Sequence, residues 1–269
     1  LQRSGIGGEA QLKAADVDCR LRLDGVGGNL QDHLQIRVQF RVEGATTLNC
    51  LNGSLAGKAR MGLQYLLNRS GPLSMAPSQL GAFFRSDDSV DRPNLEYHVQ
   101  PMSAEKLGTT LHPFPGITAS ICNLRPTSTG RVDIRSADPT QAPRIDPNYL
   151  STEEDRRIAA RSIEITREIC RQPAVAKYHP AEIKPGSQFT SPDDLAKAAG
   201  DIATTIFHPT CTCKMGLDSD PLAVTDPNLK VRGFDNLYIA DASVFPSITS
   251  GNTHAPAVMV AEKLASLLI

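Results

Sequence analysis

Apolar and polar side chains alternate along three stretches in the middle of the chain. From Gln35 to Val42 every second position is apolar, and the same alternation returns over 95–99 and 117–121. A period of two is typical of β-strands that put one face on a core and the other in water, as in antiparallel sheets. We therefore predict an antiparallel sheet with one wet face.

A fourth, shorter apolar run lies at Val132 and Ile134, after the turn-forming stretch Pro126-Thr-Ser-Thr-Gly130. Proline, serine and glycine are residues that favour a reversal of the chain. We predict a hairpin-like corner in which this turn joins the strand at 117–121 to the run at 132–134.

Helical patterns occupy the spaces between these runs. One helix is predicted over Leu55 to Asn68 and a longer one over Thr152 to Arg171, where Ser151 and Glu154 have the spacing of a capping box. A third helix begins at Ser191-Pro192, with serine as the N-cap and proline at the first helical position.

The end of the chain has a different pattern. The run Leu237 to Ala240 is apolar on both faces and ends in Asp241, which predicts a buried strand with an acid at its carboxyl end, where open α/β sheets bind ligands. Ala255 to Leu268 predicts a closing helix with Pro256 in its first turn. The side chains expected along one face of this helix are Val260, Leu264, Leu267 and Leu268.

These elements predict an α+β fold in which a central unit contains an antiparallel sheet flanked by helices. We place that unit at residues 35–205, between two pieces of an α/β unit at 1–34 and 206–269. Hydrophobic residues make up 40% of the chain and charged residues 21%, as in an ordinary globular protein.

Net charge, the C-terminal apolar stretch and the cysteines bear on nucleic-acid binding, membrane insertion and cellular location. The net charge of −1 gives no field that would attract a nucleic acid, so no such partner is expected. The stretch Ala255 to Ile269 contains Glu262 and Lys263 and is shorter than the roughly 20 residues of a transmembrane segment. Six scattered cysteines are typical of a reducing compartment, so we expect a cytoplasmic location, with peripheral attachment to a membrane left open.

Two segments near the C-terminal end carry side chains suited to moving protons. The first is Phe207 to Gly216, which contains His208, and the second is Asp241 to Pro256, which contains Asn252. Together they resemble the C-terminal signature of the glucose-methanol-choline (GMC) family of flavin-dependent alcohol oxidoreductases. Further matches to that family follow in the same order along the chain: Ser4–Gly7, Gly25–His33, Leu124–Gly130 and Ser136–Leu150.

The resemblance implies oxidation of a small-molecule alcohol with FAD as the hydride acceptor. It identifies His208 as the general base that takes the hydroxyl proton and Asn252 as the group that binds the substrate oxygen. Histidine titrates near neutral pH and an amide can steady a developing alkoxide, so both residue types suit these roles. The residues that the resemblance places against the flavin are Asp241, Ala242, Thr253 and His254.

Other histidines and the cysteines have simpler interpretations. His33 matches a motif of the family, but the capping of a turn explains it equally well. His98, His112 and His179 are expected to be surface residues or hydrogen-bonded core residues. Cys211 and Cys213 have no second Cys/His pair at zinc-finger spacing, so no metal site is expected.

Three functional alternatives remain open at this stage. The segment from His208 to Gly216 most resembles the choline dehydrogenases of the family, but its alcohol and its electron acceptor cannot be read from the sequence. The family also includes lyases, which can use a histidine base. The Gly-x-Gly-x-x-Gly loop that holds FAD pyrophosphate is not matched by Gly25–Gly28, since position 30 is Leu, so the chain resembles the later half of such an enzyme and is expected to be inactive alone.

Overall fold

The computed structural model describes residues 1–76, 78–106 and 108–268. The chain divides into two compact units, with Leu1–His33, Leu124–Asp155 and Thr205–Ile269 in unit 1 and Leu34–Asn123 and Arg156–Thr204 in unit 2. Helices and antiparallel strands are both present, which confirms the α+β class. The three-part division by sequence stays a prediction; residues 124–155 cluster with unit 1 in the structure.

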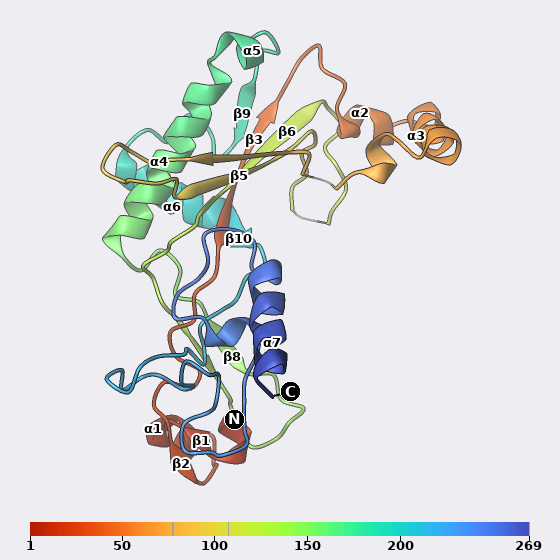
Figure 1. Ribbon diagram of the computed structural model, residues 1–269. Helices are drawn as coiled ribbons and strands as arrows, with labels where there is room; N and C mark the ends of the chain where they lie inside the picture. The colour runs from red at the N-terminus through yellow and green to blue at the C-terminus, as the bar shows by residue number, and fades with distance from the viewer. Residues whose placement is uncertain (77, 107, 269) are drawn as a thin grey trace. The chain divides into compact units, whose positions relative to one another are not determined.

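Unit 2 is built on a six-stranded sheet (Figure 1). The strands are, in spatial order, β10 (Ala203–Thr205), β3 (Leu34–Arg41), β6 (Gly116–Asn123), β5 (Leu95–Gln100) and β4 (Leu80–Phe84), and β9 (Ala181–Lys184) also pairs with β3. The pairings of β3 with β6, β6 with β5 and β5 with β4 are antiparallel. The alternation in the sequence therefore identified three central strands of this sheet.

Two helices of unit 2 lie along the sheet, α4 (Glu153–Cys170) and α6 (Pro192–Ile202) (Figure 1). The Tyr97 hydroxyl on β5 lies 3.0 Å from Thr166 Oγ1 and 3.3 Å from the carbonyl oxygen of Ser162, both on α4. The interior between helices and sheet consists of completely or almost completely buried side chains, among them Val38, Leu95, Ile121, Ile163 and Leu195. The predicted helices at 152–171 and from Ser191 onward are confirmed.

The cap of α4 differs from the prediction. The backbone N–H of Asp155 donates to Thr152 Oγ1 at 3.2 Å, so the capping residue is Thr152 and not Ser151. The Asp155 carboxylate accepts hydrogen bonds from the N–H groups of Thr127 and Ser128 at 3.0 and 2.8 Å. The predicted Ser151–Glu154 capping box was therefore wrong by one residue. The cap is Thr152, and the carboxylate three residues later, that of Asp155, binds a neighbouring loop.

The other face of the sheet is not wet, and this part of the prediction was wrong. Gln35 and Gln39 on β3 and Glu96 on β5 are between 3% and 5% exposed. Their polar groups are partly satisfied inside unit 2: Gln35 Nε2 lies 3.2 Å from His98 Nδ1, and Gln39 Nε2 donates to the carbonyl of Ala104 at 2.9 Å. Alternation predicts which residues share a face, but it does not show what covers that face.

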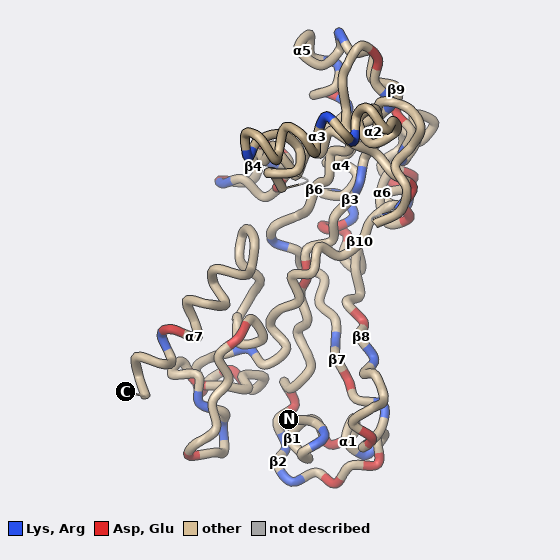
Figure 2. Tube along the Cα trace, turned by 90° about the vertical axis from the view of Figure 1, so that its right-hand side faces the viewer, with Lys and Arg blue, Asp and Glu red and all other residues tan. Residues whose placement is uncertain are grey.

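The remaining elements of unit 2 are α2 (Leu48–Asn52), α3 (Leu55–Asn68), η2 (Pro72–Ser74) and the short α5 (Pro173–Ala176). Helix α3 has the predicted bounds and lies beyond the end of the sheet (Figure 1). Its buried side chain is Met61, whereas Leu55, Leu66 and Leu67 are mostly exposed. Residues 44–86 include four Lys or Arg and no Asp or Glu, so the segment carries blue but no red in Figure 2.

Unit 1 has little regular sheet. Strands β1 (Ile6–Gly7) and β2 (Leu21–Arg22) pair in parallel, and β7 (Arg131–Asp133) pairs antiparallel with β8 (Arg144–Asp146). Its helices are η1 (Gln2–Ser4), α1 (Glu9–Ala14), η3 (Ala242–Val244) and α7 (His254–Leu268). None of the helices in the described ranges is both long and apolar enough to cross a membrane.

The hairpin-like corner predicted at Pro126–Gly130 was wrong. After β6 the chain enters unit 1, where Gly130 and Leu30 exchange backbone hydrogen bonds of 2.8 and 3.0 Å and β7 pairs with β8. A Cβ on Gly130 would lie 2.0 Å from the carbonyl oxygen of Asp146, so this close approach requires glycine. A turn signal marks where the chain bends, but it does not identify its next partner.

Two predictions for the C-terminal segment need correction. Leu237–Ala240 is not a strand, since its pairing consists of the isolated bridge between Tyr238 and Lys230. Helix α7 agrees with the prediction, and Val260 and Leu264 are buried; Leu267 and Leu268, however, are 48% and 59% exposed.

Candidate active site

His208 lies in the loop after β10, and its backbone is held by Asp32. The His208 N–H donates to Asp32 Oδ1 at 2.9 Å. Two residues of the same loop, Phe207 and Cys211, have φ of 65° and 74°, in the left-handed region that costs free energy for residues other than glycine. The surrounding contacts thus impose a strained loop that presents the imidazole of His208.

Asp32 is a buried acceptor for donors from separate segments. Besides the His208 N–H, its carboxylate accepts the hydroxyl hydrogens of Tyr149 and Thr205. Burial, together with the hydrogen bond to Asp32, raises the pKa of Tyr149 above its ordinary value, so the phenol keeps the proton that it donates. Asp32 therefore fixes the His208 loop through the backbone N–H of His208.

The His208 side chain contacts two other candidates for chemistry. Its Nε2 lies 3.4 Å from Asn252 Nδ2, and its Nδ1 lies 2.9 Å from His33 Nδ1. His208 is 9% exposed and His33 is completely buried, whereas Asn252 is exposed. The structure thus brings together the two residues predicted to be catalytic and adds His33, whose role the sequence left open.

Asn252 lies two residues before the start of α7 at His254. Thr253 is buried, and its carbonyl accepts the N–H of Ala257, while His254 is the exposed first residue of the helix. The first backbone N–H groups of an α-helix have no acceptor within the helix and carry a partial positive charge. The Asn252 amide therefore stands beside a helix end that favours anions.

The predicted flavin residues Asp241 and Ala242 form the start of η3. Asp241 Oδ1 accepts the Ser243 N–H at 2.8 Å, and the Ala242 carbonyl accepts the Cys211 N–H at 3.1 Å. Further along, the Cys213 N–H donates to the Ser243 carbonyl at 2.8 Å. The loop that carries His208 therefore runs beside η3, so two of the segments singled out in the sequence are neighbours.

Gln31 links the same loop to further segments of unit 1. Gln31 and Thr210 exchange backbone hydrogen bonds, and Gln31 Oε1 accepts the N–H of Ile248 at 2.9 Å. Its Nε2 donates to the carbonyl of Pro126 at 3.0 Å. Sequence reasoning assigned no role to Gln31, Asp32 or Tyr149, although all three lie in stretches that match the family and could have been examined for that reason.

Cys211 is buried and Cys213 is partly buried. Burial raises the pKa of Cys211 to about 11 and also raises the pKa of Cys213. Among the described residues no group of three His, Cys, Asp or Glu side chains is arranged to hold a metal ion. A thiol with such a pKa is protonated at neutral pH.

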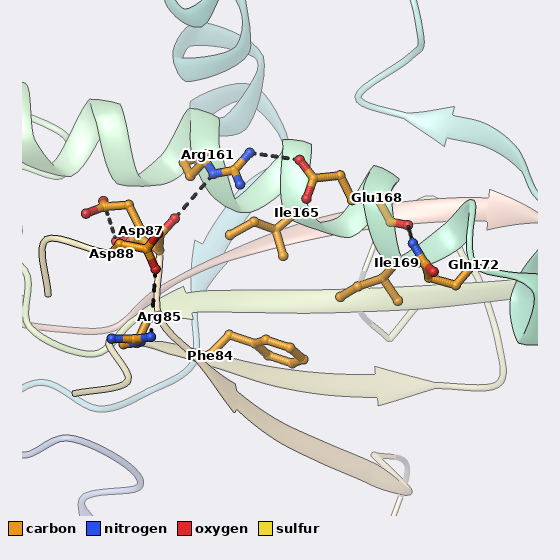
Figure 3. A pocket seen from close by; sticks show the side chains of 10 residues that line it. Phe84, Arg85, Asp87, Asp88, Arg161, Ile165, Glu168, Ile169 and Gln172 are labelled. Atoms are coloured by element: carbon orange, nitrogen blue, oxygen red, sulfur yellow. Dashed lines mark hydrogen bonds and ion pairs between the residues drawn. The ribbon is translucent and has the colours of Figure 1, made fainter. Parts of the chain in front are cut away.

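Unit 2 has a separate pocket of about 570 Å³ between α4 and the end of β4 (Figure 3). Arg161 donates to the carbonyl of Ser86 and pairs with Glu168 at 2.9 Å, and Arg85 pairs with Asp88. Arg161 and Arg85, which line the pocket, therefore both pair with carboxylates that also line it. None of the predicted site residues lines this pocket.

Comparisons with known proteins agree with the sequence motifs. The GMC oxidoreductase family model matches residues 126–261. The chain is 39% identical over 269 residues to a protein of Photobacterium profundum named oxygen-dependent choline dehydrogenase, covering all of the chain and 47% of that protein. It is 38% identical over 270 residues to the "Alcohol dehydrogenase [acceptor]" of Pseudomonas putida, covering all of the chain and 48% of that protein.

A solved structure gives the same result for the fold. Pyridoxine 4-oxidase from Mesorbium loti superposes with a TM-score of 0.82 at 28% identity, covering 99% of this chain and 48% of that one. The chain spans about half the length of the curated relatives it matches.

Proposed function

We propose that this chain, which belongs to the GMC oxidoreductase family, supplies the base and the oxygen-binding group for the oxidation of an alcohol by FAD. The observation that carries the proposal is the 3.4 Å separation of His208 Nε2 and Asn252 Nδ2. Removal of a hydroxyl proton requires a base and a hydrogen-bond donor that can both reach the same substrate oxygen.

The division of labour follows from the two side chains. Oxidation of an alcohol removes a proton from oxygen and a hydride from carbon. An unprotonated His208 Nε2 accepts the hydroxyl proton, while an N–H of Asn252 donates to the same oxygen as negative charge develops there. His208 becomes a cation in this step, next to the alkoxide that it stabilises.

FAD, when bound, supplies the hydride acceptor. The chain offers hydrogen-bond donors at the N-terminal end of α7, at Thr253 and His254, and an acceptor in the exposed carboxylate of Asp241. These suit the charged and the hydroxylated parts of FAD. A helix end favours negative charge, and a carboxylate accepts hydrogen bonds from ribityl hydroxyls. We propose that these residues, with Ala242, hold the flavin.

The substrate class follows from the relatives. One of them is named for choline, which is itself an alcohol, and another for alcohol, so an alcohol is the common element. A quaternary ammonium group favours aromatic surroundings, and this chain has 5% aromatic residues and no Trp. We therefore propose a small alcohol, with choline as one candidate to be assayed.

The test uses a flavin-loaded enzyme that includes this chain, supplied with choline or simple primary alcohols and a dye as electron acceptor. His208→Ala is expected to lower kcat by about 10²-fold or more, the usual range for loss of a general base. Asn252→Ala is expected to slow flavin reduction while retaining the flavin. His179→Asn, a change at an exposed histidine, is the matched control.

Two outcomes contradict the proposal. Wild-type turnover in His208→Ala would show that His208 is not the general base. Cleavage of a cyanohydrin without any reduction of flavin or dye would instead assign the site to a lyase.

A further inference from the structure

A buried chain of hydrogen bonds leads from a backbone carbonyl to the imidazole of His208. His33 Nε2 lies 3.2 Å from the carbonyl oxygen of Leu124, and His33 Nδ1 lies 2.9 Å from His208 Nδ1. The two rings meet edge to face, with centroids 5.1 Å apart and planes at 79°. We propose that His33 is a positioning residue that sets the tautomer of His208.

The direction of the chain follows from what each atom can do. A carbonyl oxygen only accepts, so the hydrogen between Leu124 and His33 is on His33 Nε2. In a neutral imidazole the other nitrogen, Nδ1, then has a lone pair and accepts. The hydrogen between the two rings is therefore on His208 Nδ1.

The consequence appears at the opposite nitrogen of His208. With its hydrogen on Nδ1, neutral His208 has a lone pair on Nε2, the atom that lies 3.4 Å from Asn252 Nδ2. This is the form that can accept a proton from a hydroxyl group. Many catalytic histidines are held in one tautomer by a carboxylate or carbonyl, and here a second imidazole passes the preference of a carbonyl on to the base.

The alternative role left open by the sequence, the capping of a turn, does not match these contacts. Leu124 is 91 residues from His33 and His208 is 175 residues away, so both ring nitrogens bind distant segments of unit 1. The ring is completely buried. A cap would instead bond to the backbone of its own turn.

The inference rests on the proposed function, because it assigns His33 a role through the base. His33→Leu removes the acceptor for His208 Nδ1 but keeps the site filled. In the flavin-loaded enzyme we expect this change to slow flavin reduction by about 10- to 100-fold, the range seen when an orienting partner is lost. The KM for the alcohol should change little, because His33 has no predicted contact with substrate.

His33→Asn is the conservative variant. The Asn side chain carries an oxygen acceptor and an amide donor, so it can accept from His208 Nδ1, and we expect it to recover most of the lost rate. His112→Asn is the matched control: His112 is a partly buried histidine whose Nδ1 lies 3.0 Å from Ser103 Oγ, within unit 2. Flavin content and the unfolding midpoint are measured for every variant, so that a folding defect is recognised.

The tautomer itself has a readout that does not depend on turnover. In holoenzyme labelled with ¹⁵N-histidine, a ring nitrogen that carries hydrogen is separated in chemical shift from one with a lone pair. The signals of His33 and His208 are assigned by comparing the spectra of the variants at these two positions. We expect hydrogen on Nδ1 of His208 in the wild type and in His33→Asn, and a mixture of tautomers in His33→Leu.

The outcomes separate the two hypotheses. If His208→Ala keeps wild-type turnover, the proposed function fails. If His208→Ala is inactive but His33→Leu leaves both the flavin reduction rate and the His208 tautomer unchanged, only the role of His33 is overturned. That role is also overturned if wild-type His208 carries its hydrogen on Nε2, or if His33→Asn is as slow as His33→Leu in spite of normal folding.

Discussion

The backbone N–H of His208 and Oδ1 of Asp32 lie 2.9 Å apart, although 176 residues separate them in the sequence. Asp32 is followed directly by His33, whose ring contacts the ring of His208. Two consecutive residues thus hold the backbone and the side chain of one histidine. The loop and the orientation of its imidazole are therefore fixed from the same short segment.

Asp32→Ala should lower the stability of the folded chain. The change leaves three donors, from His208, Tyr149 and Thr205, without their buried acceptor. Since each hydrogen bond to a charged group contributes about 1.5–3 kcal/mol, we expect the free energy of unfolding to fall by at least about 3 kcal/mol. Urea unfolding measures the loss. Asp235→Ala, at an exposed position, should change the free energy by less than about 0.5 kcal/mol, and an equal effect of both changes would refute the role of Asp32.

The cysteines should differ strongly in reactivity. With its pKa raised by burial to about 11, Cys211 has only about one thiolate in a thousand molecules at pH 8. We expect iodoacetamide to modify the exposed Cys19 and Cys50 and to leave Cys211 unmodified in the folded protein. Peptide mapping by mass spectrometry identifies the sites, and unfolding in urea should make all six react. Modification of folded Cys211 at the rate of Cys19 would contradict the assignment.

The same shift predicts a loss of stability at alkaline pH. The Cys211 thiol has an ordinary pKa of 9.0 and a pKa of about 11 in the folded chain, so between these values the folded state holds a proton that the unfolded state has lost. The stabilisation is complete below about pH 9 and is lost as pH rises toward 11, with a slope of at most about 1.4 kcal/mol per pH unit. Unfolding in urea across this range should show a shallower slope for Cys211→Ala. An identical slope would show that Cys211 does not contribute.

The sequence predicted local structure better than partners. Helix α3 and the start of α6 follow from periodicity and from the Ser191-Pro192 pair, which depend on neighbours in the chain. The pairing of β7 with β8 and the isolated bridge at Tyr238 depend on segments far away in sequence, which no local pattern encodes.

The candidate site shows the same limit. His208 and Asn252 were singled out by motifs, and the structure places their side chains 3.4 Å apart. His33 could not be assigned, since the two groups that bind its ring come from positions 124 and 208. Asp32 was also without a role, because a buried carboxylate is recognised by the donors around it and not by its neighbours in the chain.

The corrected cap of α4 can be tested with a pair of neighbouring changes. Thr152→Ala removes the acceptor for the Asp155 N–H and a hydrogen bond of 2.6 Å to Thr127 Oγ1. We expect a loss of about 1–2 kcal/mol, as for other N-cap residues, and less than about 0.5 kcal/mol for Ser151→Ala. Equilibrium unfolding of both variants decides between them. A larger loss for Ser151→Ala would restore the capping box predicted from the sequence.

The buried polar face of the unit 2 sheet gives the last prediction. Glu96 is 4% exposed; its Oε1 lies 3.1 Å from His98 Nε2, and its Oε2 has no hydrogen-bond partner among the described residues. Removing His98 leaves a buried carboxylate without its partner, so His98→Leu should cost about 3–5 kcal/mol. Glu96→Gln removes the charge. The loss in free energy of unfolding of the double variant should be smaller than the sum of the two single losses by about 0.5–3 kcal/mol.

Unfolding in urea of the wild type, both single variants and the double variant measures this coupling directly. His179→Asn combined with Glu96→Gln is the control pair, since His179 is exposed and its effect should add to that of Glu96. If the losses in free energy of unfolding from the His98 and Glu96 changes are strictly additive, the 3.1 Å contact between the two side chains contributes no interaction free energy. In that case the low exposure of Glu96, and not its pairing with His98, would govern the stability of this face.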